Sequence, residues 1–460
     1  MTTSKSTTQE LGTEKISKLL KQYAIPSIIA MTASSLYNIM DSVFIGHGVE
    51  DGALALAGLA LAMPLMNLAA AFGAMVGIGA SSLISIKLGQ KDNTGAKSIL
   101  ANALMLNVII GLLFGVLCFI FLGPILYLFG ASEDTIVHAR PYMQILLLGN
   151  VFTHIYLGLN NILRATGYPQ KSMRIMLTAV ISNGILDALF IFVFKWGIAG
   201  AAWATVMAQF IAMLIELGHF ANPKHEIHLS RDIFKLNKKI IMGIIAIGLA
   251  PFLMTVSASI VVIFINNALK STGGDIYIGA YGIVNRVASI FIMVVMGINQ
   301  GREPIVGYNF GAKKYGRVNH TLKLGIIAAT CVASFGFVLS MFFPKVVAMM
   351  FTTDTTLLGI SEEGLRIVML LFPIVGFQMV TSGFFQYINQ AYKAIFLSLT
   401  RQLIFLLPLL IILPRFWGSK GVWWSLPISD VVATIVAGAL LLYQFRKFKQ
   451  KELETQGQLK

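Results

Sequence analysis

The sequence predicts an all-α polytopic membrane protein with twelve transmembrane helices in two six-helix pseudo-repeated lobes. Three observations predict it. Of the 460 residues, 56% are hydrophobic and only 12% are charged, and the mean hydropathy is +0.77. Twelve apolar runs have about the length that a helix needs to cross a hydrocarbon core of about 30 Å. Motifs of the two halves also match at nearly one offset. A composition this apolar is typical of proteins in lipid rather than water.

The apolar runs define the expected helices, because about 20 residues at a rise of about 1.5 Å each cross the bilayer. The first run lacks a short apolar region followed by a cleavage signal, so we expect it to remain as a helix. The second run is long enough to tilt, to bend at Pro64 or to follow a surface helix. The expected spans are 22–46, 53–86, 98–122, 139–163, 174–194, 197–219, 240–268, 277–300, 322–343, 364–388, 394–414 and 421–445.

Basic residues set the expected orientation. An even number of spans puts both termini on one side, and the positive-inside rule makes that side the cytoplasm. This arrangement places 27 of the 35 Lys and Arg residues on the cytoplasmic side and 7 outside, with Arg286 inside a span. We therefore expect both termini to be cytoplasmic.

Matching motifs indicate an internal duplication. An offset of about 221 to 225 residues aligns Pro26 with Pro251, "LGQKD" at 88–92 with "FGAKK" at 310–314, and "WGIAGAAW" at 196–203 with "WGSKGVWW" at 417–424. Each half has six spans and begins in the cytoplasm, so the repeats are parallel in topology. The expected parts are a cytoplasmic tail at 1–21, an N-lobe at 22–219, a basic cytoplasmic linker at 220–239, a C-lobe at 240–445 and a cytoplasmic tail at 446–460.

Asp41 and Asp187 are acids well inside expected spans, with no basic neighbour in either stretch. A carboxylate at membrane depth costs at least about 2.5 kcal/mol on insertion scales, so such residues indicate a functional site and favour a transporter. The helical rise places Asp41, Asp187 and Thr205 roughly 8, 10 and 12 Å below the outer ends of their helices, at one level. Hydrogen-bonding side chains lie about one turn before each acid: Asn183, Tyr37 and Asn38.

The second half lacks this cluster, because Asp41, Asp187 and Thr205 align with Asn266, Pro408 and Leu426. Two carboxyl groups close together in a low dielectric resist being charged together, so one of them can bind and release a proton. Carboxylate, amide and hydroxyl oxygens also suit a hard cation such as Na⁺. For Asn183 and Thr205, hydrogen-bonded packing between helices is the alternative. H⁺ and Na⁺ both stay open as coupling ions, and no cofactor and no other metal are expected.

Glycines and a proline recur near the expected inner end of the eighth span. Gly301, Pro304, Gly307 and Gly311 are expected to interrupt a helix at the cytoplasmic edge. The interruption serves either the architecture or a hinge that absorbs backbone rotation.

Five motifs resemble the multidrug and toxic compound extrusion (MATE) family, in its DinF/MepA-like branch. They are "NIMDSVFIGHG" at 38–48, "LRATGYPQKSM" at 163–173, "SNGILDALFIF" at 182–192, "WGIAGAAWATVMAQ" at 196–209 and "GREPIVGYNFGAKKYGRV" at 301–318. The last motif is long and specific, and together the five span nearly the whole chain.

The resemblance implies two six-helix lobes around a central cleft, alternating access, and export of organic cations or amphiphiles in exchange for H⁺ or Na⁺. It also implies a first-lobe cation-coupling site at Asp41, Asn183, Asp187 and Thr205. A fourth-helix asparagine of some relatives corresponds to Asn160 or Asn161. Arg302 and Glu303 depart from the pair expected in the family, so their local role stays open.

Several other residues are candidates for a substrate cleft. Methionine and aromatic side chains suit varied ligands, although helix packing is the alternative for each: Met63, Met66, Met293, Met296 and Tyr281. Arg286 and Asp430 are charges inside expected spans and need a partner or water. Arg286 would pair with an acid or meet an anionic group, and Asp430 would attract a cation or stabilise the last helix.

Other functional classes fit less well. A flippase for a lipid-linked or amphipathic substrate is the alternative function, but it should carry several cationic residues for phosphate, and the spans show mainly Arg286. An arginine-rich stripe that would bind nucleic acid is missing from the sequence. A channel would need a charge ring or filter loop in every repeat. Cys118 and Cys331 lie in apolar runs and predict no disulfide.

The histidines lie mostly at helix ends or in loops, so no catalytic constellation or metal-ligand spacing predicts an enzyme. We expect a monomeric transporter in a bacterial-type plasma (inner) membrane. Its expected partners are the lipid bilayer and small molecules such as organic cations, drugs and amphiphiles.

Overall fold

The computed structural model describes residues 8–49, 52–229 and 235–455, apart from the side chains of residues 36–39, 53 and 451–455. All regular elements in these ranges are helical, which confirms the predicted all-α class. Many large apolar side chains lie exposed on the helices, among them Leu112, Leu113 and Ile120. This exposure suits helices that are surrounded by lipid.

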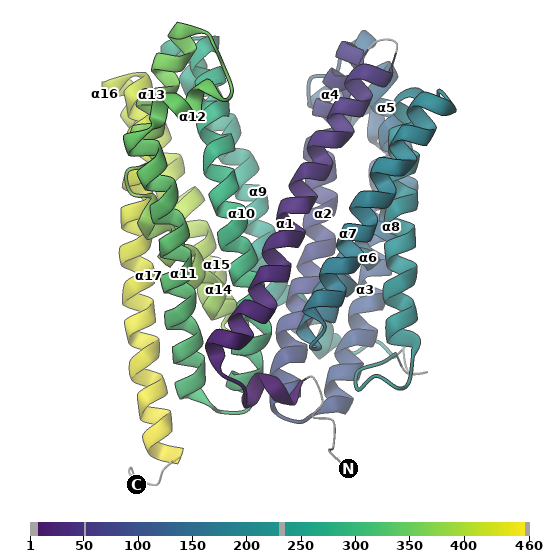
Figure 1. Cartoon of the computed structure of the whole chain (residues 1–460), viewed down its shortest axis with the longest axis vertical. Coiled ribbons are helices and arrows are strands. Elements are labelled where there is room, and N and C mark those ends of the chain that lie inside the picture. The colour runs from purple at the N-terminus through teal and green to yellow at the C-terminus, as the bar shows by residue number, and fades with distance from the viewer. Residues whose placement is uncertain (1–7, 50–51, 230–234, 456–460) are drawn as a thin grey trace. The chain divides into compact units, whose positions relative to one another are not determined.

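The elements follow one another as long and short helices, joined mostly by short turns and, between α8 and α9, by a longer segment (Figure 1). The first half contains η1 (Gln9–Gly12), α1 (Ile16–Gly48), α2 (Gly52–Gly89), α3 (Asn93–Ile120), α4 (Leu122–Leu128), α5 (Glu133–Leu148), α6 (Asn150–Ala165), α7 (Pro169–Asp187), the π-helix η2 (Ala188–Val193) and α8 (Gly197–Ala221). The second half contains α9 (Lys238–Gly273), α10 (Asp275–Gly311), α11 (Tyr315–Phe342), α12 (Pro344–Met349), α13 (Thr355–Met369), α14 (Phe372–Tyr387), α15 (Ala391–Leu399), the π-helix η4 (Thr400–Leu406), α16 (Leu407–Trp417) and α17 (Ser419–Thr455).

Ten helices within the described ranges are long and apolar enough to cross a membrane, or up to twelve if each of two bent pairs forms one span. The bent pairs occupy the expected spans 139–163 and 364–388. Helices α5 and α6 meet at 57°, and α13 and α14 meet at 51°. The first bend lies at Gly149, where a Cβ atom would come within 2.5 Å of the Val206 side chain. The second bend precedes Pro373 in the first turn of α14, where proline cannot donate a backbone hydrogen bond.

Matching turns support the internal duplication. Lys91 and Lys313 follow α2 and α10 in left-handed conformations, with φ of 61° and 58°. The next residue in each case closes the helix end, since Asp92 N donates to Lys87 O at 2.9 Å and Lys314 N donates to Asn309 O at 2.8 Å. Gly167 and Asn389 form a second such pair, with φ of 100° and 59°. Within each pair, the two residues are separated by the same offset that relates the sequence motifs of the two halves.

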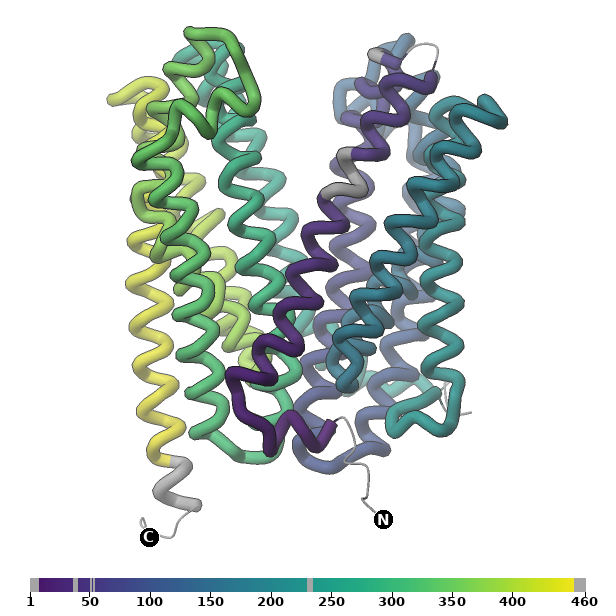
Figure 2. The backbone as a smooth tube through the Cα atoms, viewed as in Figure 1, coloured from purple at the N-terminus to yellow at the C-terminus, as the bar shows by residue number. Residues whose placement is uncertain are grey.

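Contacts divide the described chain into two compact units. The first unit comprises the described residues of 8–13, 29–49, 52–229 and 235–252, and the second comprises residues 14–28 and 253–455. The division therefore falls inside α1 and α9, just after Pro26 and Pro251. Figure 2 shows α1, in purple, continuing past this point as one helix. The start of α1 thus packs within the second unit, whereas the predicted N-lobe begins at residue 22.

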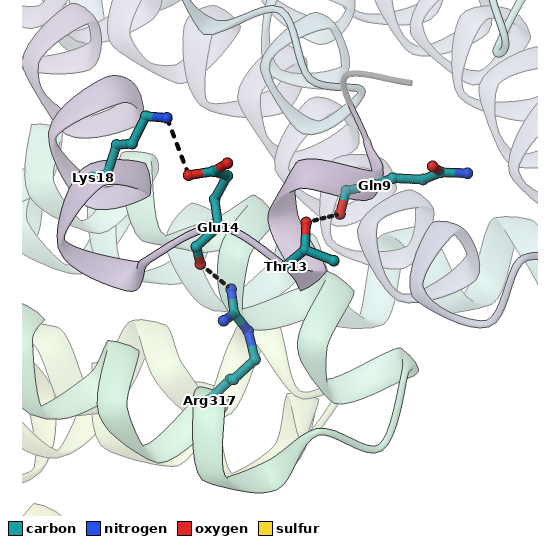
Figure 3. A network of polar contacts seen from close by, with 5 residues as sticks. All are labelled: Gln9, Thr13, Glu14, Lys18 and Arg317. Carbon is teal, nitrogen blue, oxygen red and sulfur yellow. Dashed lines mark hydrogen bonds and ion pairs between the residues drawn. The ribbon is translucent and has the colours of Figure 1, made fainter. Parts of the chain in front are cut away.

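Small residues and one polar contact hold the start of α1 in the second unit. A Cβ atom on Gly301 would lie 2.5 Å from Ala24, so glycine allows α10 to approach α1 closely. At the same end, Arg317 Nη2 donates to Glu14 O at 2.7 Å, and Lys18 Nζ forms an ion pair with Glu14 Oε2 at 3.0 Å (Figure 3).

The predicted helix interruption near residues 301–311 is wrong. Helix α10 runs unbroken from Asp275 to Gly311 and includes Pro304. Gly301 and Pro304 are buried in the helix, and Gly301 serves the close approach to α1. The chain turns only after Gly311, at Ala312 and Lys313.

Candidate functional site

The first unit brings together the two acids that the sequence singles out. Asp41, from the C-terminal half of α1, and Asp187, the last residue of α7, are 4% and 0% exposed. The two carboxyl groups lie within electrostatic range of each other. Each carboxyl group also has one buried oxygen, Oδ1, without a hydrogen-bond partner among the side chains that the structure describes. The site therefore has free acceptor capacity on both acids in an otherwise buried setting.

Asn183 joins Asp187 to α8. In the amide orientation that satisfies both of its ends, Asn183 Nδ2 donates to Asp187 Oδ2 at 2.8 Å, and its Oδ1 accepts from Thr205 N at 3.2 Å. Asn183 and Thr205 are 2% and 3% exposed. The spacing of one helical turn between Asn183 and Asp187 puts both side chains on the same face of α7. Helices α7 and α8, side by side in Figure 1, thus hold the second acid in place.

Tyr142 of α5 is a member of the site that the sequence did not reveal. Its hydroxyl donates to Asp41 Oδ2 at 3.5 Å, and its side chain is fully buried. Tyr142 lies in an ordinary apolar run, without a motif that would mark it. Only the packing of α5 within the first unit reveals this contact.

A π-helix follows Asp187 directly. The segment η2 widens the backbone over Ala188–Val193, and Phe190 and Ile191 of this segment are buried. Such π-helical turns are rare and occur frequently at functional sites. The regular α-helical hydrogen-bonding pattern of α7 therefore ends at Asp187.

The fourth-helix asparagines lie in different networks from the acids. Asn160 donates to Glu216 Oε1 at 2.8 Å, and Asn161 Nδ2 donates to Leu157 O at 2.8 Å. Among the described residues, neither asparagine forms a hydrogen bond with Asp41 or Asp187. The side chains of Tyr37 and Asn38, the other supporting candidates, lie outside the described residues.

The substrate-cleft candidates differ in their surroundings. Met63 is 44% exposed, whereas Met66 packs against the core of the first unit. Met293 and Met296 are half-buried in α10, and Tyr281 packs near Trp423 in the core of the second unit, with ring centroids 6.3 Å apart.

The two charged candidates also differ. Arg286 is exposed, whereas Asp430 is buried and accepts from Arg401 Nε at 2.6 Å. Of the two roles that the sequence left open for Asp430, this ion pair fits the stabilisation of the last helix.

Glu216 of α8 is a fully buried acid that the sequence reading passed over. It lies inside the expected span 197–219, only a few residues from its end. Asp41 and Asp187 are recognisable in the sequence as acids within apolar spans, and Glu216 meets the same criterion. Its position near the end of the span, where acids reach water easily, obscured it.

Comparisons with known proteins agree with this architecture. The MatE family model matches residues 26–189 and 246–412. The chain is 26% identical over 431 residues to the multidrug export protein MepA of Staphylococcus haemolyticus, and the match covers 94% of each chain. It is 27% identical over 434 residues to the MepA protein of Staphylococcus aureus strain NCTC 8325, covering 93% of this chain and 94% of that protein.

Solved structures share the fold. One is the outward-facing conformation of a multidrug resistance MATE family transporter of the MOP superfamily, with a TM-score of 0.90 and 24% identity over 98% of this chain and 100% of that chain. Another is a MOP superfamily transporter from Pyrococcus furiosus, with the same TM-score, identity and coverage.

Proposed function

Because the chain belongs to the MatE family, we propose that it is a secondary active multidrug efflux antiporter. It exports organic cations or amphiphiles in exchange for H⁺ or Na⁺, by alternating access between the two sides of the membrane. The MepA relatives carry the name of multidrug export proteins, which supports this class of substrate. Transport, rather than an enzymatic reaction, is the proposed activity.

The observation that carries the coupling proposal is the pair of buried acids with unpartnered oxygens. Asp41 Oδ1 and Asp187 Oδ1 lie in the same unit, and neither accepts a hydrogen bond from the described residues. An ionised carboxylate in this setting is costly unless a proton or a cation compensates it. The site therefore favours occupancy by the coupling ion and releases it only when the surroundings change.

The remaining contacts orient the acids for this role. Tyr142 and Asn183 each donate to one carboxylate oxygen and leave the other oxygen free. A proton needs only one such oxygen, whereas Na⁺ needs several oxygen ligands and would draw on the Thr205 hydroxyl and the Asn183 carbonyl as well. Differential affinity of the ion for the two conformations of the protein supplies the work of export.

The proposed setting is a bacterial-type inner membrane, with both termini in the cytoplasm and the protein acting as a monomer. Substrate enters from the cytoplasm or the inner leaflet, and loading of the ion at Asp41 and Asp187 from outside drives its release. The excess of Lys and Arg in the inner connections supports this orientation.

Reconstituted vesicles test the proposal. Efflux of ethidium is measured with a proton gradient alone, a sodium gradient alone, or neither. We expect one gradient to drive efflux, and Asp41→Asn and Asp187→Asn to abolish that response. Glu362→Gln is the matched control, because Glu362 is a partly exposed acid paired with Arg366 on one helix. Efflux that continues without both gradients would reject coupled antiport, and unaltered transport by the two Asn variants would reject the assigned site.

A further inference from the structure

Glu216 forms a second carboxyl centre in the first unit, apart from Asp41 and Asp187. It lies eleven residues after Thr205 on α8, which is about 16 Å along the helix axis. Its side chain is 0% exposed. The linker that follows α8 leaves from the same end of the helix, at Asn222. Glu216 therefore lies close to one aqueous face, and Thr205 lies deeper along the same helix.

A three-helix network fixes one oxygen of Glu216. Asn160 Nδ2, from α6, donates to Glu216 Oε1 at 2.8 Å and to Ser172 O of α7 at 3.2 Å. Ser172 Oγ in turn donates to Asn160 Oδ1 at 2.8 Å. Both ends of the Asn160 amide are therefore occupied, and the amide nitrogen must face Glu216. All three side chains are at most 5% exposed.

The other oxygen of Glu216 is free. Oε2 is buried and has no hydrogen-bond partner among the described residues. A carboxylate ion normally satisfies both oxygens, whereas a protonated carboxyl group carries no charge and presents one O–H donor beside its remaining acceptor capacity. The network therefore matches a carboxyl group that accepts at Oε1 and holds a proton at Oε2.

The neighbouring charged groups do not neutralise Glu216. From α7, Lys171 Nζ contacts His219 Nδ1 at 2.9 Å, and Arg174 is exposed. From α6, Arg164 donates to Asn161 and Tyr156 lies within electrostatic range.

Two other close contacts with α8 lie farther along the helix. The segment η2 contacts it at Gly200, and the α5–α6 junction contacts it at Val206. No basic side chain of the described residues forms an ion pair with Glu216. A bare carboxylate at this place would be buried without a counter-charge, which is strongly unfavourable.

A metal ion fits the centre poorly. Na⁺ and other hard cations take several oxygen ligands, but the amide N–H group of Asn160 already points at Oε1. Ser172 Oγ points at Asn160 rather than at Glu216. One free carboxylate oxygen remains, which is enough for a proton and too little for a cation.

Titratable imidazole rings lie on the next turn of α8 and in the linker that follows it. His219 is 3% exposed, and its Nε2 atom has no partner among the described residues. Its ring stacks on His225 of the linker, with centroids 3.9 Å apart. His225 Nδ1 lies 3.2 Å from the hydroxyl of Tyr168. These groups can exchange protons with the aqueous face and lie one helical turn from Glu216.

We propose that Glu216, held by Asn160 and Ser172, is a second proton-binding site of the first unit. It is protonated in this conformation and exchanges its proton through His219 and His225 with the aqueous face at the end of α8. The proton leaves as Glu216 ionises and moves to an imidazole nitrogen or to water, so that no other group is consumed. Its contribution to transport rests on the proposed antiport, whereas proton binding itself does not.

Infrared difference spectroscopy of the purified full-length protein in nanodiscs tests proton binding. The C=O stretch of protonated carboxyl groups is followed from acidic to alkaline pH. In the Asp41→Asn/Asp187→Asn background we expect a protonated carboxyl band at neutral pH, which Glu216→Gln removes and Glu216→Asp retains. Glu362→Gln, at a partly exposed acid in the second unit, should leave the band unchanged. A neutral-pH band that is missing before Glu216→Gln, or that survives it, would overturn the proposal.

A second variant keeps the test informative if Glu216→Gln folds poorly. Asn160→Leu removes the amide donor that favours the ionised form, so the band should persist to a pH about one unit higher, a roughly tenfold change in proton affinity. If Asn160→Leu leaves the pH dependence of the band unchanged, the proton is bound by a group other than Glu216.

The vesicle assay separates this inference from the proposed antiport. Under a proton gradient, Glu216→Gln should alter the pH dependence of efflux, and Glu216→Asp should restore it. If the Asp41 and Asp187 variants transport normally while the Glu216 band is present, the antiport site is wrong and the proton site stands. If those variants lose transport while the Glu216 band is missing, only the present inference fails.

Discussion

The ion pair between Arg401 and Asp430 makes a quantitative prediction about the second unit. Arg401 Nε and Asp430 Oδ1 lie 2.6 Å apart, and the two side chains are 21% and 7% exposed. The pair joins the π-helix η4 to α17. At an effective dielectric constant of about 20, two unit charges about 4 Å apart attract by about 4 kcal/mol. Burial of both charges offsets much of this attraction.

Single and double substitutions should therefore differ. Arg401→Met keeps the apolar stem but leaves the Asp430 carboxylate buried without a counter-charge, so it should lower the free energy of unfolding by about 3 to 5 kcal/mol. The double variant Arg401→Met/Asp430→Leu removes both charges and should lose less than about 1 kcal/mol, or gain stability. The interaction energy between the two positions should be at least about 2 kcal/mol.

A double-mutant cycle measures this difference. Unfolding by a denaturing detergent is followed by tryptophan fluorescence in mixed micelles, for the wild type, both single variants and the double variant. The pair Arg366–Glu362 is the control, because its side chains are 54% and 30% exposed on one helix, and its interaction energy should stay near about 0.5 kcal/mol. If Arg401→Met is as mild as the double variant, the two charges do not meet in a buried setting and the reasoning fails.

Two further predictions concern the first unit. Burial, followed by the charges of Lys171 and His228, lowers the pKa of His225, so its contribution to stability is present above the unfolded pKa of about 6.5 and is lost as the pH falls below it. Hydrogen exchange at Leu229 N, which donates to Phe220 O at 2.7 Å, should therefore lose protection near about pH 5.5 after correction for intrinsic rates; an equal loss in His225→Gln would contradict this cause. Gly248→Ala should reduce the yield of folded protein sharply, because the new Cβ atom would lie 1.9 Å from a backbone carbonyl of α2, whereas Gly438→Ala meets open space and should have little effect; similar yields of the two variants would refute the close packing of α2 and α9.

The sequence predicted much of the fold because lipid imposes a simple rule. Backbone groups in a bilayer must bond within their own helix, so apolar runs of sufficient length become helices. The repeated turns were also visible, since "LGQKD" and "FGAKK" end their helices with the same left-handed residue at Lys91 and Lys313. The bends at Gly149 and before Pro373 were not predicted, because a hydropathy profile does not record where neighbouring helices force a change of direction.

The candidate acids were predictable for the same reason, since a charge in an apolar span is costly wherever it points. Their partners were not. Tyr142 reaches Asp41 from a helix about a hundred residues later in the chain, and Asn160, expected near the acids, instead bonds Glu216. Which side chains meet depends on helix rotation and crossing, and these are set by packing between helices rather than by the pattern of any one helix.

The sequence by itself determined that this chain forms membrane-spanning helices, that its halves are related, and that acids lie at membrane depth. Each of these properties follows from the free energy of placing one residue or one segment in lipid. The tertiary structure alone decided that α1 and α9 divide between two units, that Arg401 neutralises Asp430, and that Glu216 keeps one oxygen free. Those properties depend on distances between residues far apart in the chain, and only the packed helices fix such distances.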